Sequence, residues 1–407
     1  MKKINGGVTA AKGFMASSTA AAIKYQGRTD MAMVYSEKPC AVAGTFTSNV
    51  VKAAPVIWDR NIVNEKGVAQ AVVVNSGIAN ACTGEEGLKY CEMTAQAVSD
   101  ALNVDKDMVM VGSTGVIGMQ LPIERICNGV KDLARKLDGS IEAGNDAARA
   151  IMTTDTKEKE IAFEVEISGK TVTIGGMAKG SGMIHPNMCT MLSYITTDAL
   201  ISQKLMQKAL SEIVKDSFNM ISVDGDTSTN DTLLVFANGM AGNDLIKTED
   251  EDYRIFYNAL NEVCTYLAKQ MAADGEGATK LVESVVLNAD TKDNARTLAK
   301  SVVCSSLTKA AMYGCDANWG RILCALGYSG VNFDPDKVDL FFVDGDKKIL
   351  IFTNGAGTQF SEEEATEMLK KDHVTVVSDM HMGTECATAF GCDLTHEYVN
   401  INADYRS

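Results

Sequence analysis

Two kinds of hydrophobic spacing alternate along this chain from one end to the other. Apolar residues at intervals of three and four predict an amphipathic helix that contains Leu88, Cys91, Ala95, Val98 and Leu102. Residues 161–167 instead alternate apolar with polar side chains, which is typical of a half-buried β-strand. Because both patterns recur along all 407 residues, we expect a mixed α/β protein.

The same patterns predict most of the remaining elements. Further helices are expected at residues 126–137, 205–214, 256–271 and 294–307. Short apolar runs predict strands at residues 108–111, 233–236, 285–287, 340–343, 350–352 and 374–377. Ser168 and Gly169 predict the turn of a hairpin after residues 161–167. We place a domain boundary between two parts, residues 1–285 and 286–407.

Composition excludes several classes of function. The net charge of −15 opposes nucleic-acid binding, which depends on lysine and arginine side chains that neutralise phosphates. The chain has no run of about 20 apolar residues that would cross a membrane, and its first residues do not resemble a secretory signal. Its 11 cysteines are scattered without paired spacing, so we expect free thiols in a reducing cytoplasm.

Metal binding has little support in the sequence. The four histidines form no HExxH motif and have no zinc-finger spacing with cysteine, so we expect no bound metal. His185 lies close to Thr190, but a single histidine in a loop is more often structural. Residues 224–230 (DGDTSTN) resemble a calcium loop without the glycine and glutamate spacing of an EF-hand, and we interpret them as a turn near a site.

Thr190 is the strongest candidate for a catalytic residue. It lies between a glycine-rich, nearly uncharged segment and an apolar run. A threonine hydroxyl is a poor nucleophile without a base, and cleavage of the chain just before a threonine supplies one in the new α-amino group. The glycine-rich residues 175–182 fit neither a Walker motif nor GxGxxG, so they are either a flexible loop or a close backbone approach to Thr190.

Residues 112–118 (GSTGVIG) are a second candidate segment, because a strand that ends in a glycine-rich turn can present backbone N–H groups. By itself this pattern is more often a plain turn. Residues 274–280 (DGEGATK) likewise fit either a solvated helix end or a carboxylate, Glu276, that faces a substrate ammonium group.

Segments along nearly the whole chain resemble the ornithine acetyltransferases, also called glutamate N-acetyltransferases, of arginine biosynthesis. Two positions depart from the family pattern: Ile78, where a polar asparagine is expected, and Cys189, where alanine is usual. The matching segments occur in the same order as in the family, at residues 43–49, 52–56, 75–84, 112–118, 151–156, 176–198, 224–230, 274–280, 316–321 and 398–407.

The resemblance implies a set of residue roles. It makes the bond between Cys189 and Thr190 the self-cleavage site and Thr190 the nucleophile that carries the acetyl group. It assigns the oxyanion hole to Thr114 and Gly115. The substrate would be contacted by Thr153, Lys179, Thr190, Glu276, Asn402 and Ser407.

The resemblance also implies the architecture and the assembly. The expected fold is an αββα-type sandwich like that of self-cleaving N-terminal-nucleophile aminopeptidases, with a further C-terminal α/β domain whose tail reaches the active site. The two cleavage products, an α chain of residues 1–189 and a β chain of residues 190–407, would form a heterotetramer with two copies of each.

Three functions follow as hypotheses. The first is a ping-pong transfer of acetyl from N2-acetyl-L-ornithine to L-glutamate with no bound cofactor; some members of the family also take the acetyl group from acetyl-CoA. The second is a self-processing aminopeptidase or amidase in which water accepts the acyl group. The third is a binding protein for amino acids without turnover.

Overall fold

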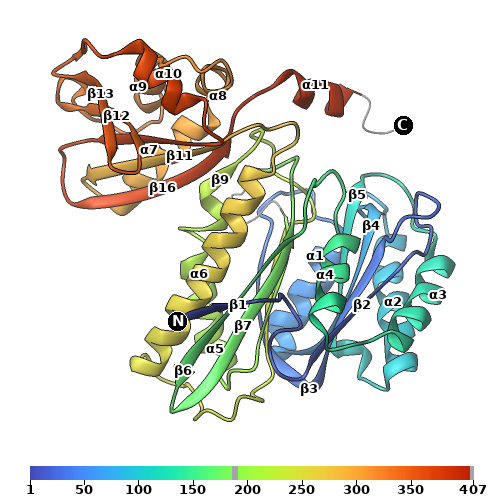
Figure 1. Cartoon of the computed structure of the whole chain (residues 1–407). Helices are drawn as coiled ribbons and strands as arrows, with labels where there is room; N and C mark the ends of the chain where they lie inside the picture. Colours follow the sequence, from blue (N-terminus) through green and yellow to red (C-terminus); the bar gives the residue numbers. More distant parts are fainter. Residues whose placement is uncertain (186–190, 404–407) are drawn as a thin grey trace. The chain divides into compact units, whose positions relative to one another are not determined.

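A computed structural model describes residues 1–185 and 191–403, which divide into two units (Figure 1). The first unit comprises residues 1–180, 191–218 and 227–267 of this described part. The second comprises residues 181–185, 219–226 and 268–403. The helices of these residues are all too short or too polar to cross a lipid bilayer.

One mixed sheet forms the centre of the first unit. Its β8–β10 and β4–β5 pairs are parallel, and the other pairs are antiparallel. A further strand, β2 (Phe14–Thr19), pairs with β3. The order of the strands is β1 (Lys2–Ile4), β6 (Lys159–Ile167), β7 (Lys170–Lys179), β8 (Leu192–Thr197), β10 (Thr232–Ala237), β3 (Met31–Phe46), β4 (Val68–Ile78) and β5 (Val109–Val116).

The two halves of this sheet pack face to face. Tyr194 of β8 and Leu234 of β10 belong to the same buried cluster as Val74 of β4 and Met110 of β5. Gly112 of β5 makes room for Tyr194, whose hydroxyl oxygen would lie 2.1 Å from a Cβ atom at that position. The interior of the unit is therefore a two-layered β-sandwich.

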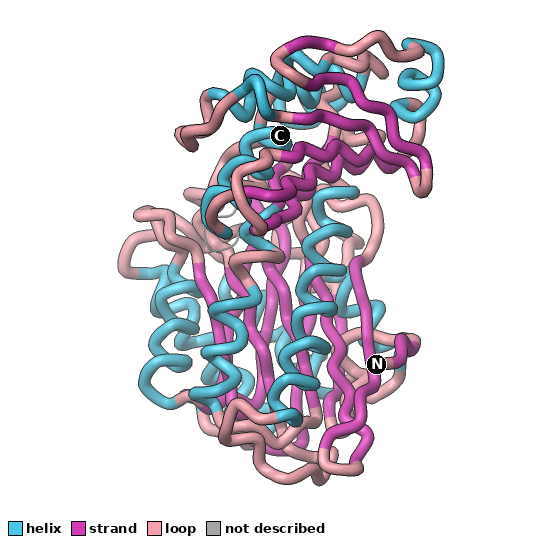
Figure 2. Tube along the Cα trace, turned by 90° about the vertical axis from the view of Figure 1, so that its left-hand side faces the viewer, coloured by secondary structure: helices cyan, strands magenta, loops and turns pink. Residues whose placement is uncertain are grey.

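Helices cover the outer faces of the sandwich. Val98 of α2 (Glu86–Leu102) and Val130 of α3 (Ile123–Arg135) pack in one buried cluster with Val73 of β4. Leu267 of α6 (Glu251–Ala273) lies against Gly176 of β7. The remaining helices of the unit are α1 (Ala54–Asn61), α4 (Ile141–Ala150) and α5 (Gln203–Ile213). Figure 2 shows helices of this unit running alongside its long strands, and the expected αββα order is confirmed.

The second unit is an α/β layer structure. Its sheet has the order β14 (Ala356–Gly357), β13 (Lys347–Thr353), β12 (Asp339–Asp344), β15 (His373–Asp379), β11 (Leu281–Ala289), β16 (Glu385–Cys392) and β9 (Ile221–Ser222). Its helices are α7 (Lys292–Cys304), α8 (Ser306–Tyr313), α9 (Trp319–Gly327), α10 (Glu362–Leu369) and α11 (His396–Ala403). β9 joins this sheet although it lies in the middle of the sequence.

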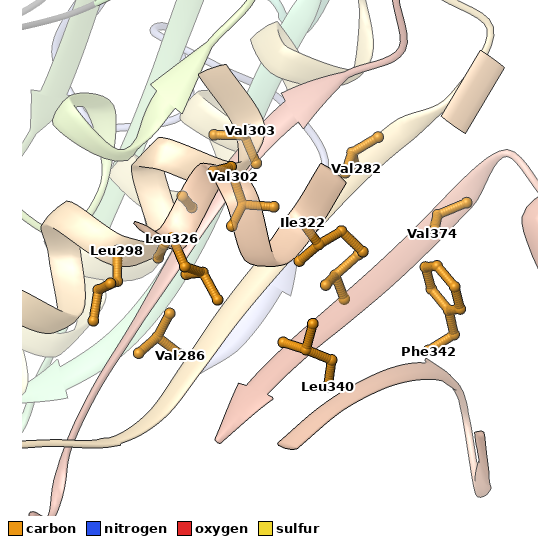
Figure 3. Close-up of a cluster of buried hydrophobic side chains, with 14 of the residues drawn as sticks. Val282, Val286, Leu298, Val302, Val303, Ile322, Leu326, Leu340, Phe342 and Val374 are labelled. Atoms are coloured by element: carbon orange, nitrogen blue, oxygen red, sulfur yellow. The ribbon is translucent and has the colours of Figure 1, made fainter. Parts of the chain in front are cut away.

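Figure 3 shows the core of the second unit. Val302 of α7 and Ile322 of α9 pack against strand residues such as Val286 of β11 and Leu340 of β12. Each of these four residues is fully buried. Burial of such side chains supplies most of the stability of a unit of this kind.

The structure corrects two predicted turns. Residues 112–115 are not a turn, because β5 continues to Val116, and Gly175 and Gly176 lie inside β7 rather than in a loop. A Cβ atom on Gly175 would lie 2.1 Å from the carbonyl oxygen of Gly7. These glycines therefore allow close packing inside the sandwich, whereas the sequence patterns were interpreted as a turn at residues 112–115 and a loop at residues 175–182.

A predicted turn agrees with the structure, and the predicted domain boundary lies within a strand. The predicted hairpin turn is confirmed: Ser168 and Gly169 have φ angles of 50° and 68° between β6 and β7. The predicted domain boundary between residues 285 and 286 falls inside β11, which pairs along its length in the second sheet. The chain passes between the two units several times, and the last change falls between residues 267 and 268, within α6.

We predict that Leu340→Ala lowers the free energy of unfolding of the second unit by about 2–5 kcal/mol, because it opens a cavity in a packed core. Leu340 is 0% exposed, whereas Leu307 of the same unit is 60% exposed. Leu307→Ala is therefore the matched control and should change the value by less than about 0.5 kcal/mol. Urea unfolding followed by circular dichroism measures both, and equal effects would contradict this packing.

Candidate active site

The side chain of Lys179, at the end of β7, contacts two other predicted site residues of the first unit. Its ammonium group donates hydrogen bonds to the hydroxyl of Thr153, at 2.8 Å, and to the hydroxyl of Thr114, at 3.4 Å. The side chain of Lys179 is only 9% exposed. The structure therefore brings three of the predicted residues together around one nearly buried positive charge.

Gly115 has a structural reason to be glycine besides its predicted role. Its φ angle is 130°, which other residues rarely adopt. A Cβ atom there would lie 2.2 Å from the backbone carbon of Gly77 on β4, where the pairing of β4 and β5 becomes irregular. Ile78, next to this irregularity, is buried in the cluster beneath α2 and α3, so its side chain offers no polar contact.

A network of buried amides and hydroxyls fixes the end of β5. The amide of Asn230 donates to the carbonyl oxygens of Ala79, at 2.5 Å, and Ser113, at 2.8 Å. The hydroxyl of Ser113 donates to the amide oxygen of Asn75 at 2.6 Å. Because these groups are buried and paired, they hold the backbone just before Thr114 in one position.

The carboxylate of Asp155 binds the backbone beside both Thr153 and Lys179. It accepts hydrogen bonds from the N–H groups of Thr153, at 3.1 Å, and Gly180, at 2.7 Å. The ammonium group of Lys159 lies 2.8 Å from it and that of Lys179 lies 3.8 Å from it. Burial alone would raise the pKa of Asp155, but the two ammonium groups and the N–H of Gly180 hold this pKa well below its ordinary value. Asp155 is therefore ionised at neutral pH.

The second unit carries Glu276 and Asn402. Glu276 is 6% exposed, and the side-chain amide of Asn402 on α11 donates to its carboxylate at 2.7 Å. The N–H of Glu276 donates to the carbonyl oxygen of Ser181 at 2.9 Å. A Cβ atom on Gly182 would lie 2.3 Å from the Glu276 carboxylate, so this glycine lets the backbone approach a buried acid.

Residues 224–230 include the predicted turn. Asp224, the first of these residues, binds the part of the chain just before residue 186. The carboxylate of Asp224 accepts hydrogen bonds from the N–H groups of Met183, at 2.6 Å, and Ile184, at 2.9 Å. The N–H of Val223 donates to the carbonyl oxygen of Ile184 at 2.7 Å. These three bonds fix the segment that leads towards Thr190 in the sequence.

His185 belongs to the second unit and packs as a structural residue. Its Nδ1 atom lies 3.1 Å from the hydroxyl of Ser222 and 3.5 Å from the thiol of Cys304. Burial, reinforced by the positive charge of Lys300 and opposed by Asp226, lowers the pKa of His185 to about 4. The imidazole is therefore neutral at pH 7.

Some predicted site residues are not described by the structure. Cys189, Thr190 and Ser407 lie outside the described residues. Thr114, Gly115, Thr153 and Lys179 belong to the first unit, and Glu276 and Asn402 belong to the second. Within residues 1–185 and 191–403, no group of three or more His, Cys, Asp or Glu side chains is arranged to hold a metal ion.

Sequence reasoning missed Asp155 and Lys159 as parts of the site. Lys159 is the first residue of β6, and Asp155 precedes it by four residues. A charged residue in an alternating pattern is normally assigned to the solvent face. In the structure Lys159 is 1% exposed. The spacing of four residues between Asp155 and Lys159 was the available signal, but residues 155–158 precede β6 and form no helix.

We predict that the second unit loses stability as the pH falls from 6.5 to about 4, because the unfolded chain then binds a proton on His185 that the folded unit excludes. His185→Gln should make unfolding less dependent on pH in this window. His396→Gln, at an exposed position, is the control. Urea unfolding at several pH values measures the slope, and an identical slope in His185→Gln would contradict the assignment.

Comparison with known proteins adds the family. The model of the ArgJ family matches residues 15–407. An arginine biosynthesis bifunctional protein ArgJ 1 from Clostridium acetobutylicum is 49% identical over 403 residues, covering 99% of this chain and 98% of the relative. The protein ArgJ from Symbiobacterium thermophilum, also named an arginine biosynthesis bifunctional protein, is 50% identical over 409 residues, covering 100% of both chains.

A solved structure is also similar. The crystal structure of the arginine biosynthesis bifunctional protein ArgJ from Bacillus halodurans has 47% sequence identity and a TM-score of 0.50. The match covers 98% of the crystal chain but 52% of this chain. The crystal chain therefore corresponds to about half of the sequence.

Proposed function

Because the chain belongs to the ArgJ family, we propose that it is an acetyltransferase of arginine biosynthesis that transfers acetyl from N2-acetyl-L-ornithine to L-glutamate. The observation that carries this proposal is the family match over residues 15–407, at 49–50% identity to full-length relatives. The buried group of Lys179, Thr153 and Thr114 supports it, since an ammonium group and two hydroxyls suit the carboxylate of an amino acid.

The proposed nucleophile is the hydroxyl of Thr190. Cleavage of the peptide bond after Cys189 gives Thr190 an α-amino group whose ordinary pKa of about 7.7–8.0 suits a base near neutral pH. The hydroxyl attacks the acetyl carbonyl while the amine takes its proton. Collapse of the tetrahedral intermediate expels ornithine, whose amine receives that proton, and leaves acetyl-Thr190. The α-amine of glutamate then attacks this ester and restores the hydroxyl.

Thr114 and Gly115 are the proposed oxyanion hole, through the hydroxyl and the backbone N–H. The support is preorganisation: the Asn230 amide and the Gly77 contact hold the backbone on either side of Thr114 before substrate arrives. Donors that are already fixed stabilise a developing negative charge without further rearrangement.

The other proposed contacts are with the ends of the amino-acid substrates. Lys179 and Thr153 bind the α-carboxylate, and Glu276, held by Asn402, binds a substrate ammonium group. Thr190 and Ser407 complete the proposed set. An ammonium group and a carboxylate among the proposed ligands suit the charged ends of amino acids, which favours the transferase over a hydrolase.

We also propose that the cleavage products stay together as a heterotetramer of two α and two β chains. The interleaved strands support their association: β8 and β10, from residues after 190, pair with β7 and β3, from residues before it. The length of the crystal relative, half of this chain, is consistent with a cleaved product.

The ten described cysteines are all free thiols, which fits the proposed cytoplasmic location.

We predict that Thr190→Ala leaves a single chain of 407 residues and reduces acetyl transfer below about one thousandth of wild type, because both cleavage and catalysis use the same hydroxyl. Denaturing intact-mass spectrometry and an ornithine-release assay measure the two effects. The control is Thr297→Ala on the exposed side of α7, which should be cleaved and active. A cleaved or active Thr190→Ala protein would refute this role.

The relatives are named bifunctional, and we propose that the second activity is acetylation of glutamate by acetyl-CoA, bound as a substrate and not as a resident cofactor. With acetyl-CoA as the only donor, wild-type protein should form N-acetylglutamate and release free CoA thiol. Transfer from N-acetylornithine without any from acetyl-CoA would make the chain monofunctional. Rapid acetate release without glutamate would instead favour the hydrolase, and ligand binding without either reaction would favour the binding protein.

A further inference from the structure

Asp155 and Lys159 form a fully buried ion pair that no proposed step of the reaction uses. Both side chains are 0% exposed, and the Nζ–Oδ1 distance is 2.8 Å. Lysine and aspartate are rarely buried completely, since removal of each charge from water costs free energy that the pair only partly returns. A buried pair of this kind beside a binding site is therefore a candidate for a functional constraint.

The contacts of Asp155 converge on the substrate-binding residues. Its Oδ2 atom accepts the N–H of Thr153, whose hydroxyl contacts Lys179, and its Oδ1 atom accepts the N–H of Gly180, which follows Lys179. The Asp155 carboxylate therefore fixes the backbone next to Thr153 and Lys179, the two residues proposed to bind the carboxylate of the substrate.

The distances show how the two lysines share this carboxylate. The ammonium group of Lys159 lies 2.8 Å from Asp155, whereas that of Lys179 lies 3.8 Å away and is 2.8 Å from the Thr153 hydroxyl. Substitution of Lys159 would remove the nearer of these two ammonium groups, so the Asp155 carboxylate would attract Lys179 more strongly. The Lys179 ammonium would then move closer to Asp155 and away from Thr153 and Thr114.

We propose that Asp155 and Lys159 are positioning residues, and that Lys159 engages Asp155 so that Lys179 stays directed towards the carboxylate of the amino-acid substrate. This role rests on the proposed function of Lys179 and Thr153. It differs from a purely structural role, which would affect folding without distinguishing a charged substrate from a neutral one.

The test compares two donors in wild-type protein and Lys159→Met. N-acetylornithine carries the carboxylate, and its α-carboxamide is the neutral analogue. In Lys159→Met the KM for N-acetylornithine should rise about tenfold or more with kcat changed less than about threefold, because ground-state binding of the charged group is lost. The KM for the carboxamide should change less than about threefold, since it forms no ion pair with Lys179.

Lys2→Met is the matched control. Lys2 of β1 forms an ion pair with Glu164, which lies on β6 as Lys159 does. The side chain of Lys2 is 76% exposed. This variant should leave both KM values unchanged. If both KM values rise equally in Lys159→Met, or neither rises, the positioning role is overturned.

A second variant keeps the test decisive if Lys159→Met does not fold. Asp155→Asn/Lys159→Met removes both charges. The attraction of Lys179 to the Asp155 carboxylate is then lost together with the Lys159 ammonium group that shares this carboxylate. Asparagine keeps one amide oxygen that can accept a backbone N–H, so part of the positioning by Asp155 is retained. The KM for N-acetylornithine should therefore rise less than in Lys159→Met, or by less than about tenfold over wild type where the single variant is insoluble. An equal rise for both donors in the double variant would overturn the inference. Wild-type protein that transfers no acetyl group would instead refute the proposed function.

Discussion

The pairing of β8 with β10 in the middle of the first sheet is the constraint on which the rest of the structure depends. β8 lies between β7 and β10, and β10 lies between β8 and β3, so each strand is hydrogen-bonded on both sides. All residues of both strands are buried. The N–H of Thr232 donates to the carbonyl oxygen of Met191 at 2.8 Å, which fixes the chain one residue after Thr190. A chain cut before Thr190 would retain every one of these ladders.

With the proposed cleavage before Thr190, the sandwich would still hold the neighbouring side chains in place. Lys179 ends β7 and Thr114 lies near the end of β5, so both side chains are carried by strands of a packed sandwich. Buried groups then fix their backbones: Asn230 on one side and Asp155 on the other. In their proposed roles, side chains held in this way would lose little freedom when a substrate binds, which favours both affinity and transition-state stabilisation.

The spacing of residues in the sequence predicted the elements that are defined by neighbours close in sequence, namely single helices and one hairpin. α2, α3 and α6 were predicted because their apolar residues recur every three or four positions. The turn at Ser168 and Gly169 was predicted because a Ser-Gly pair between two strand patterns favours a turn, and both residues have positive φ in the structure. Gly112 and Gly175 were misread, since the groups that require a glycine, Tyr194 and Gly7, are distant in sequence. Spacing alone contains no information on such contacts.

The site was predictable only in part for the same reason. The resemblance to a family supplied Thr114, Thr153 and Lys179, and the structure places the two threonine hydroxyls within hydrogen-bond distance of the Lys179 ammonium group. Asp155 and Lys159 were not assigned a role because their importance comes from burial. A lysine at the start of a strand is normally solvated, and only the packed structure shows it at 1% exposure.

The central claim is that Thr190 carries the acetyl group between donor and acceptor. The most direct measurement is to mix the protein with N-acetylornithine in the absence of glutamate, quench it in acid, and record the masses and fragment spectra of the denatured chains. The account predicts two chains, residues 1–189 without modification and residues 190–407 with one acetyl group on Thr190. An uncut chain, an acetyl group at another residue, or no acetylated chain during active turnover would contradict it.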